Sequence, residues 1–238
     1  MKGLYKKELQ FYLNNPIGYI TIILFAVFAN FLFVKDIFIV GVASMRQFFE
    51  TLPWLLMIFV PALAMRSLAD EKKNNTLDIL LSLPISELQI VLAKFFAVIS
   101  VVLIGLALTL GLPISLFVLT HEFGSNIYLP EILVGYFGVI LTAGVFAAVS
   151  LFFSSRTKNQ VVAFLLSAVT LFFLIVVAGD FISGVLPPIA QEFLNYLSPI
   201  THMSGFNKGV IDLRSIYYFI SFITICLFLT VVDLEKRP

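Results

Sequence analysis

Charged residues are scarce in this sequence, and cysteine and histidine are almost absent. Asp, Glu, Lys and Arg make up only 12% of the 238 residues, against about 25% in average soluble domains. A soluble domain of this length would lack the polar side chains to cover its surface, which excludes an ordinary globular enzyme. The single cysteine, Cys226, excludes an internal disulfide and a cysteine-based zinc site. A net charge of +1 provides no basic surface for nucleic acid.

Motifs that carry chemistry are also missing. The sequence holds no G-x-x-x-x-G-K-[ST], so it does not bind ATP through a P-loop, and it has neither H-E-x-x-H nor G-x-S-x-G. The apolar runs lack a carboxylate near mid-length, which an ion-driven carrier usually needs. Lys94 stands at the end of one run, where we expect it to reach the interface. We expect His121 and His202 to be unpartnered surface residues, and no catalytic, cofactor or metal site in this chain.

Long uncharged runs dominate the sequence, of which 60% is hydrophobic. A membrane-spanning helix needs about 20 apolar residues. The second candidate is the weakest, because only 15 residues separate Glu50 from Arg66. We predict an all-α polytopic membrane protein that forms one domain over residues 1–238. Its six transmembrane helices are expected within residues 9–34, 51–65, 95–120, 132–155, 159–179 and 215–232.

The distribution of Lys and Arg indicates the orientation of these spans. With six spans and both termini cytoplasmic, the inner segments hold 11 of the 15 basic residues and the outer segments hold 4. Cytoplasmic loops are generally enriched in Lys and Arg. Omitting the weak second span would move Arg66, Lys72 and Lys73 outside and reverse every later segment. We therefore predict six spans with both termini inside.

Residues 1–15 have the pattern of an amphipathic helix. Pro16 interrupts the chain before the first span, which predicts a helix lying on the cytoplasmic surface. The alternative is a cytosolic extension of the first span. The expected apolar face consists of Tyr5, Leu9, Tyr12 and Leu13, with Lys2, Lys6 and Gln10 on the other face.

Residues 66–89 contain a short helical pattern between two breaks. Asn75 is a candidate N-cap, with Asp78 positioned to support the first turn. Ser86 and Gln89 form a capping box that opens the third span. A helix of about two turns is too short to be stable alone, so it either docks on another protein or packs on its own bundle. Its apolar stripe consists of Leu77, Leu80 and Leu81 and ends at Pro84.

Residues 180–214 form a predicted outer loop with two apolar segments, 181–191 and 193–201. Each is about half the length needed to cross a membrane. Short helices at the outer interface or a re-entrant pair would fit these lengths, and could line an exit or meet an external partner. The loop is interrupted by Pro187, Pro188 and Pro199.

Three segments resemble one family of membrane proteins. The run Glu71-Lys-Lys-Asn-Asn75-Thr76-Leu77-Asp78-x-Leu80-Leu81-x-x-Pro84 resembles the coupling segment of type-2 ABC exporter permeases, with Asn75 and Asp78 in place of the usual Gly and Glu. Both replacements are compatible with a helix start. The N-terminal Lys7-Glu8-Leu9 and Asn15-Pro16-Ile17-x-Tyr19-Ile20 resemble the elbow helix and first span of that family.

The outer segment is similar to one subgroup. Leu197-Ser198-Pro199-Ile200-Thr201-His202, Gly205-Phe206, Gly209-Val210-Ile211-Asp212 and Tyr217-Tyr218-Phe219 resemble the permeases associated with gliding motility, which are themselves similar to the nitrous-oxide-reductase maturation permease. The resemblance covers the whole chain in order.

The resemblance implies the membrane subunit of an ABC transporter in the bacterial inner membrane. A second permease copy, identical or similar, would complete a dimer, and two separate ATP-binding subunits, which hold ATP and Mg²⁺, would dock on residues 66–89. A periplasmic or membrane-anchored accessory protein is a further expected partner. An ion-coupled carrier and a non-transporting scaffold remain alternatives. The implied docking residues are Glu71, Thr76, Leu77, Asp78, Leu80, Leu81 and Pro84; the elbow residues are Lys7, Glu8, Leu9 and Pro16; and the outer-loop residues are Pro187, Pro188, Ser198, Pro199, His202, Gly209 and Asp212.

Overall fold

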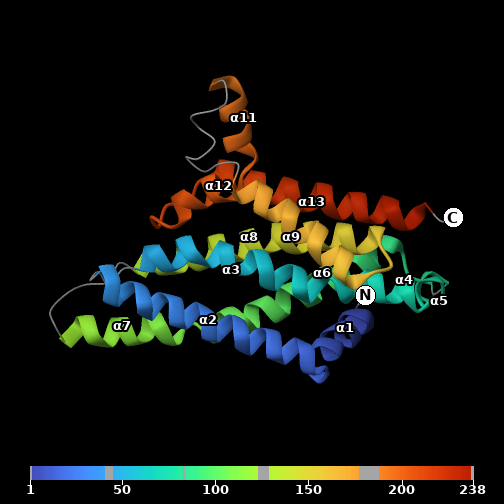
Figure 1. The fold of residues 1–238 in the computed structure, drawn as a ribbon, viewed down its shortest axis with the longest axis horizontal. Helices are drawn as coiled ribbons and strands as arrows, with labels where there is room; N and C mark the ends of the chain where they lie inside the picture. The colour runs from blue at the N-terminus through green and yellow to red at the C-terminus, as the bar shows by residue number, and fades with distance from the viewer. Residues whose placement is uncertain (1, 41–44, 83, 123–128, 177–187, 237–238) are drawn as a thin grey trace.

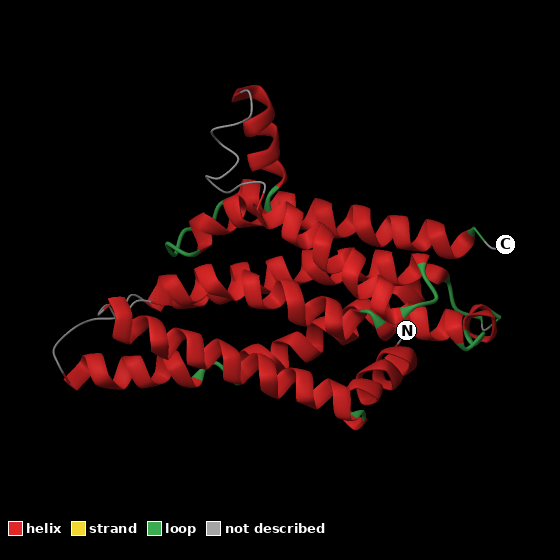
Figure 2. Cartoon of the chain, in the orientation of Figure 1, coloured by secondary structure: helices red, strands yellow, loops and turns green. Residues whose placement is uncertain are grey.

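The computed structural model describes residues 2–40, 45–82, 84–122, 129–176 and 188–236. Throughout these residues the regular elements are helices (Figures 1 and 2), so the predicted all-α class is confirmed. Five helical stretches in this part of the chain are long and apolar enough to cross a membrane. They are formed by α2 (Pro16–Val40), α3 (Met45–Ala64) with α4 (Arg66–Lys73), α6 (Glu87–Ala107) with α7 (Gly111–Glu122), α8 (Leu129–Arg156) and α13 (Leu213–Glu235).

The remaining predicted span corresponds to α9 (Gln160–Val176), a shorter apolar helix of 17 residues that packs on α8 and α3. Residues 177–179, the end of that predicted span, lie outside the described residues. Figure 1 shows both chain termini at the end of the bundle that also carries α1 (Lys2–Asn14), α4 and α5 (Leu77–Leu81). We call this the elbow end.

The weak second span is longer than the uncharged run indicated. α3 begins at Met45, six residues before the run, and includes Glu50, whose side chain is exposed. Pro53 and Pro61 lie inside the helix, where each lacks the N–H of a normal helical hydrogen bond. A break at Met65 then separates α3 from α4, which continues the chain at the elbow end.

The centre of the bundle is α8, which packs against α3, α6, α9, α13, α4 and α12 (Pro199–Phe206). Small residues on α8 allow this close packing. A Cβ added at Gly138 would lie 2.7 Å from the Cβ of Phe206, so α12 can approach α8 this closely only because position 138 has no side chain. α8 thereby holds α12 against the membrane helices.

The outward surface of the bundle is apolar. Large hydrophobic side chains are at least half exposed on several helices, for example Phe31 of α2, Phe172 of α9 and Phe228 of α13. An apolar surface of this extent would favour aggregation in water but is the expected surface of a protein solvated by lipid. The helices identified as spans therefore present the surface that a bilayer requires.

Candidate functional site

The N-terminal helix α1 folds back against the bundle at Pro16, the first residue of α2. Proline is favoured at this position because the first turn of a helix leaves its N–H groups unbonded. A Cβ at Gly18 would lie only 1.9 Å from the backbone oxygen of Tyr12, so the sharp angle between α1 and α2 requires glycine there. We did not predict this requirement from the sequence, where the only sign of it is a glycine two residues after the proline.

The buried face of α1 differs from the predicted one. Leu4, Glu8 and Tyr12, spaced four residues apart, are buried, and α1 packs chiefly on α6. Leu13, predicted on the apolar face, is exposed, whereas Tyr5 and Leu9 are half-buried. Burial raises the pKa of Tyr12, whose hydroxyl donates a hydrogen bond to the Leu63 carbonyl at 3.1 Å. α1 is thus a packed part of the bundle.

A buried ionic cluster lies beneath α1. The Nζ atom of Lys94, which is 1% exposed, lies 3.1 Å from Glu8 Oε1, 2.9 Å from Glu71 Oε1 and 2.7 Å from the Ser67 carbonyl oxygen. These partners come from α1 and α4, while Lys94 belongs to α6. An ammonium group has three hydrogen-bond donors, and this one uses all three. The prediction that Lys94 reaches the membrane interface is therefore wrong, because two carboxylates meet it inside the protein.

A cavity of about 280 Å³ adjoins this cluster between α1 and α4. Glu71 Oε2 and Ser67 Oγ are buried beside it with no hydrogen-bond partner within the described part of the chain. No group of three or more potential metal ligands occurs among the described residues. The cluster joins α1, α4 and α6, and its described residues do not place a nucleophile beside a base.

The start of α4 is held by Ser154 of α8. Its hydroxyl oxygen accepts hydrogen bonds from the backbone N–H groups of Leu68 and Ala69, each at 3.1 Å, and donates to the Met65 carbonyl at 3.0 Å. The break at Met65 leaves these helix-end groups without helical partners. A serine in the last turn of α8 therefore fixes the junction between α3 and α4.

Further along α4, polar contacts reach two more helices. Lys72 forms an ion pair with Asp233 of α13 at 3.6 Å, and Arg156 at the end of α8 contacts the same carboxylate at 2.9 Å. The Gln160 side-chain amide donates to Asp70. α4 is thus connected to α8, α9 and α13 as well as to the Lys94 cluster.

Asn75 has a different role from the one predicted. Its φ of 53° lies in the left-handed region, which glycine and asparagine adopt most readily and which often ends a helix. Asn75 therefore terminates α4, whereas the carbonyl of Thr76 accepts the first hydrogen bond of α5, from the Leu80 N–H at 3.0 Å. The prediction of an N-cap at Asn75 is wrong, and this backbone geometry explains why glycine suits the same position.

Helix α5 has only five residues, and its leucines face inward. Leu77 and Leu80 are buried, and Leu80 clusters with Leu4 of α1 and Ile90 of α6. Of the two alternatives for the stripe, packing on its own bundle is the one observed. Leu77 and Leu80 therefore have little surface left for a partner in this structure.

The opposite face of α5 is open. Ile79 is 65% exposed, and Thr76 and Pro84 are exposed on either side of it. Leu81 is half-buried, and the side chain of Asp78 lies outside what the structure describes. As predicted, Ser86 begins the next helix, where its Oγ accepts from the Gln89 N–H at 3.4 Å.

The predicted outer segment contains two helices, α11 (Pro188–Leu197) and α12. Pro188 and Pro199 are their first residues, and Ser198 is the buried N-cap of α12. Pro187 lies outside the described residues. In Figure 1, α11 extends away from the bundle whereas α12 lies along it.

His202 is not the unpartnered surface residue that we expected. Its ring stacks on Tyr218 of α13 at 4.0 Å between centroids, and its Nε2 lies 3.0 Å from the Tyr196 carbonyl oxygen. Gly209 has a φ of 75°, which strongly favours glycine. Asp212 is the N-cap of α13, where it accepts from the Arg214 N–H at 2.9 Å. These residues hold α12 and the start of α13 together.

The comparison with protein families agrees with this architecture. The family model described as ABC-2 family transporter protein matches residues 3–233, nearly the whole chain. No curated protein matches the chain. The match includes α1, the α4–α5 segment and all the membrane helices described above. The chain belongs to the family of ABC-2 transporter membrane proteins.

Proposed function

We propose that this membrane subunit works in an ATP-driven exporter of the bacterial inner membrane. A separate ATP-binding subunit would dock at the elbow end, which would then be the cytoplasmic side. The proposal is supported chiefly by the Lys94 cluster, because it joins α4, which leads into α5, to α1 and α6 through three hydrogen bonds of the buried Lys94 ammonium group. The positive-inside distribution of Lys and Arg supports the same orientation.

The docking surface in this proposal is the open side of the segment, consisting of Thr76, Ile79 and Pro84. Force applied to α5 would reach α4 through the short turn at Asn75. From α4 it would pass to α6 through Lys94 and to α8 through Ser154. In this proposal Glu71 and the leucines of α5 hold the segment on the bundle, whereas Thr76, Ile79 and Pro84 contact the ATP-binding subunit.

Transport in this proposal requires a second permease copy, identical or similar, and two ATP-binding subunits. The interior of the bundle around α8 is filled, since its residues 142–151 are all buried. A route for substrate between two copies is consistent with that packing. In the same proposal α11 and α12 narrow the outer exit, and α11 meets a periplasmic partner, as expected for the motility-associated subgroup.

The test is co-purification with the ATP-binding subunit, followed by measurement of ATP hydrolysis. Ile79→Asp should release the ATP-binding subunit and abolish any stimulation of ATPase activity, because it places a charge in the contact. Val210→Asp is the matched control, since Val210 is a similarly exposed apolar residue outside the membrane helices, in the turn between α12 and α13 at the other end of the bundle. Unchanged co-purification and hydrolysis with Ile79→Asp would refute docking at α5.

A further inference from the structure

A second cavity lies at the end of the bundle opposite the elbow end. It has a volume of about 360 Å³ and lies between the first turns of α3, the end of α9 and helix α12. A cavity needs about 10–15 Å³ of this kind of volume to hold one water molecule, so this one is large enough for a small organic group. None of the sites described above uses it.

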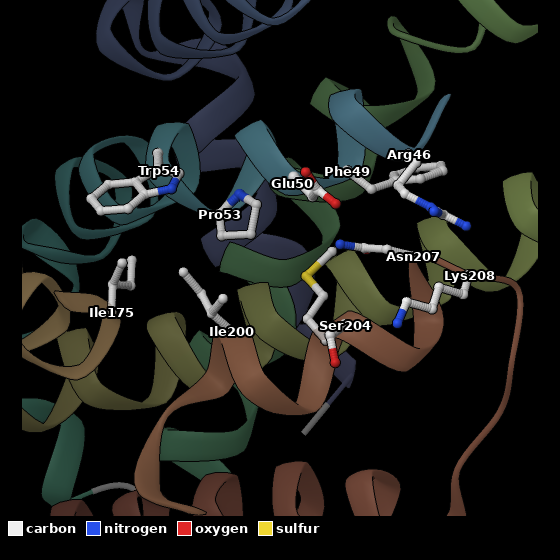
Figure 3. Close-up of a pocket in the computed structure, with 11 residues that line it drawn as sticks. Arg46, Phe49, Glu50, Pro53, Trp54, Ile175, Ile200, Ser204, Asn207 and Lys208 are labelled. Carbon is white, nitrogen blue, oxygen red and sulfur yellow. The ribbon is translucent and has the colours of Figure 1, made fainter. Parts of the chain in front are cut away.

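The cavity has a polar part and an apolar part. In Figure 3, Arg46, Asn207 and Lys208 lie together on one side, with Glu50 beside them, whereas Trp54 and Ile200 lie toward the other side with Ile175. A molecule that fills this space should carry both polar and apolar groups. A purely polar solute would leave the apolar part in contact with water, and a hydrocarbon would offer the polar side chains no hydrogen bonds.

Asn207 indicates what the polar part requires. Its side chain is 6% exposed, and its Oδ1 atom is buried without a hydrogen-bond partner in the described residues. A buried acceptor without a donor is costly. Because Glu50 also presents an acceptor here, a ligand group with several N–H donors and a positive charge would satisfy both residues.

The same part of the cavity also has positive charge, from Lys208 and Arg46. These side chains suit a phosphate, which Arg and Lys bind through charge-assisted hydrogen bonds. A phosphate joined to a primary ammonium by a short link would place its two charges on these two kinds of partner. Trp54, with its indole partly exposed, is of the residue type enriched at membrane interfaces, where such headgroups lie.

We propose that this cavity binds a membrane lipid with a phosphoethanolamine headgroup. The ammonium group donates hydrogen bonds to Asn207 Oδ1 and Glu50, the phosphate contacts Lys208, and the first part of an acyl chain covers Trp54 and Ile200. A choline headgroup has the same charges but no N–H donor, and a glycerol headgroup has no positive charge. The site should therefore prefer ethanolamine lipids over both.

The test uses Trp54, which is the only tryptophan in the chain. The purified full-length protein is placed in detergent micelles doped with phospholipids that carry brominated acyl chains, and quenching of Trp54 fluorescence is measured against lipid mole fraction. We expect brominated phosphatidylethanolamine to quench at a mole fraction about tenfold lower than phosphatidylcholine or phosphatidylglycerol, the difference corresponding to one charge-assisted hydrogen bond. No ATP-binding subunit is needed, so this test is independent of the proposed function.

Variants sharpen the result. Asn207→Leu and Glu50→Gln should each reduce the preference for ethanolamine, whereas Lys35→Gln, which alters an exposed lysine outside the cavity, should leave it intact. If Asn207→Leu does not fold, Glu50→Gln, at an exposed position, still decides. Equal quenching by the three lipids would overturn the proposal. Displacement by water-soluble phosphoethanolamine as effective as by the lipid would also overturn it, because the acyl chain would then contribute nothing.

Discussion

Replacing Lys94 with methionine removes the ammonium group but keeps much of the length of the side chain. Glu8 and Glu71, whose side chains are 9% and 17% exposed, would then face each other without the cation that they share. Removing one partner of a buried ion pair typically costs about 3–5 kcal/mol, because the remaining charge stays in a poorly solvated place. We expect Lys94→Met to lower the free energy of unfolding by that amount.

The triple variant Glu8→Gln, Glu71→Gln, Lys94→Met separates stability from coupling. It removes all three charges together, so its stability should return close to that of the natural protein. Coupling should not return, because α4 would no longer be tied to α6 through a charged group. Both quantities can be measured on the purified complex, by denaturation in detergent and by stimulated ATP hydrolysis.

The matched control is Lys6→Met, because Lys6 lies two residues from Glu8 but is exposed and does not line the cavity beside the cluster. Its effect on unfolding should stay within about 0.5 kcal/mol, as for most surface substitutions. If Lys94→Met proves as stable as Lys6→Met, the buried cluster does not hold the elbow end together. Full stimulation of ATPase activity in the triple variant would refute its role in coupling.

Five further substitutions, at four positions, test the local geometry. Asn75→Gly should keep or slightly raise stability and Asn75→Val should lower it by about 1–2 kcal/mol, since valine resists a positive φ; equal denaturation midpoints would contradict this. Gly18→Ala should detach α1, because the new methyl would overlap the Tyr12 carbonyl, and faster proteolysis between α1 and α2 would report it. Leu80→Ala should lower the free energy of unfolding by about 2–5 kcal/mol. Ile79→Ala should change that free energy little and should weaken co-purification with the ATP-binding subunit. A larger loss of stability from Ile79→Ala than from Leu80→Ala would contradict the burial of Leu80.

The membrane helices could be predicted from the sequence because their signal is local. An uncharged run of about 20 residues has few alternatives to a span, and five of the six predicted spans lie in helices long and apolar enough to cross a membrane. The limits of the second span were harder to predict. Glu50 ended the uncharged run, yet α3 continues past it, since a charge at the end of a helix can remain exposed.

The contacts of the site depended on tertiary structure and could not be predicted in the same way. Lys94, Glu8 and Glu71 are far apart in the sequence, and each alone is compatible with an exposed position. Glu8 did carry a signal, because it lies between Leu4 and Tyr12 at a spacing of four residues. The left-handed backbone conformation of Asn75 had a similar signal, because the family usually has glycine at this position. We nevertheless interpreted Asn75 as the start of a helix.

Crosslinking from single cysteines in α5 tests most directly whether an ATP-binding subunit docks on its open face. In a Cys226→Ser background, which removes the only native cysteine, Ile79→Cys and Leu80→Cys can be compared in native membranes with a short thiol crosslinker. Because Ile79 is exposed and Leu80 is buried, we expect Ile79→Cys to crosslink to the ATP-binding subunit and Leu80→Cys not to do so. Crosslinking from Leu80→Cys alone, or from neither position in an active complex, would contradict docking through this face.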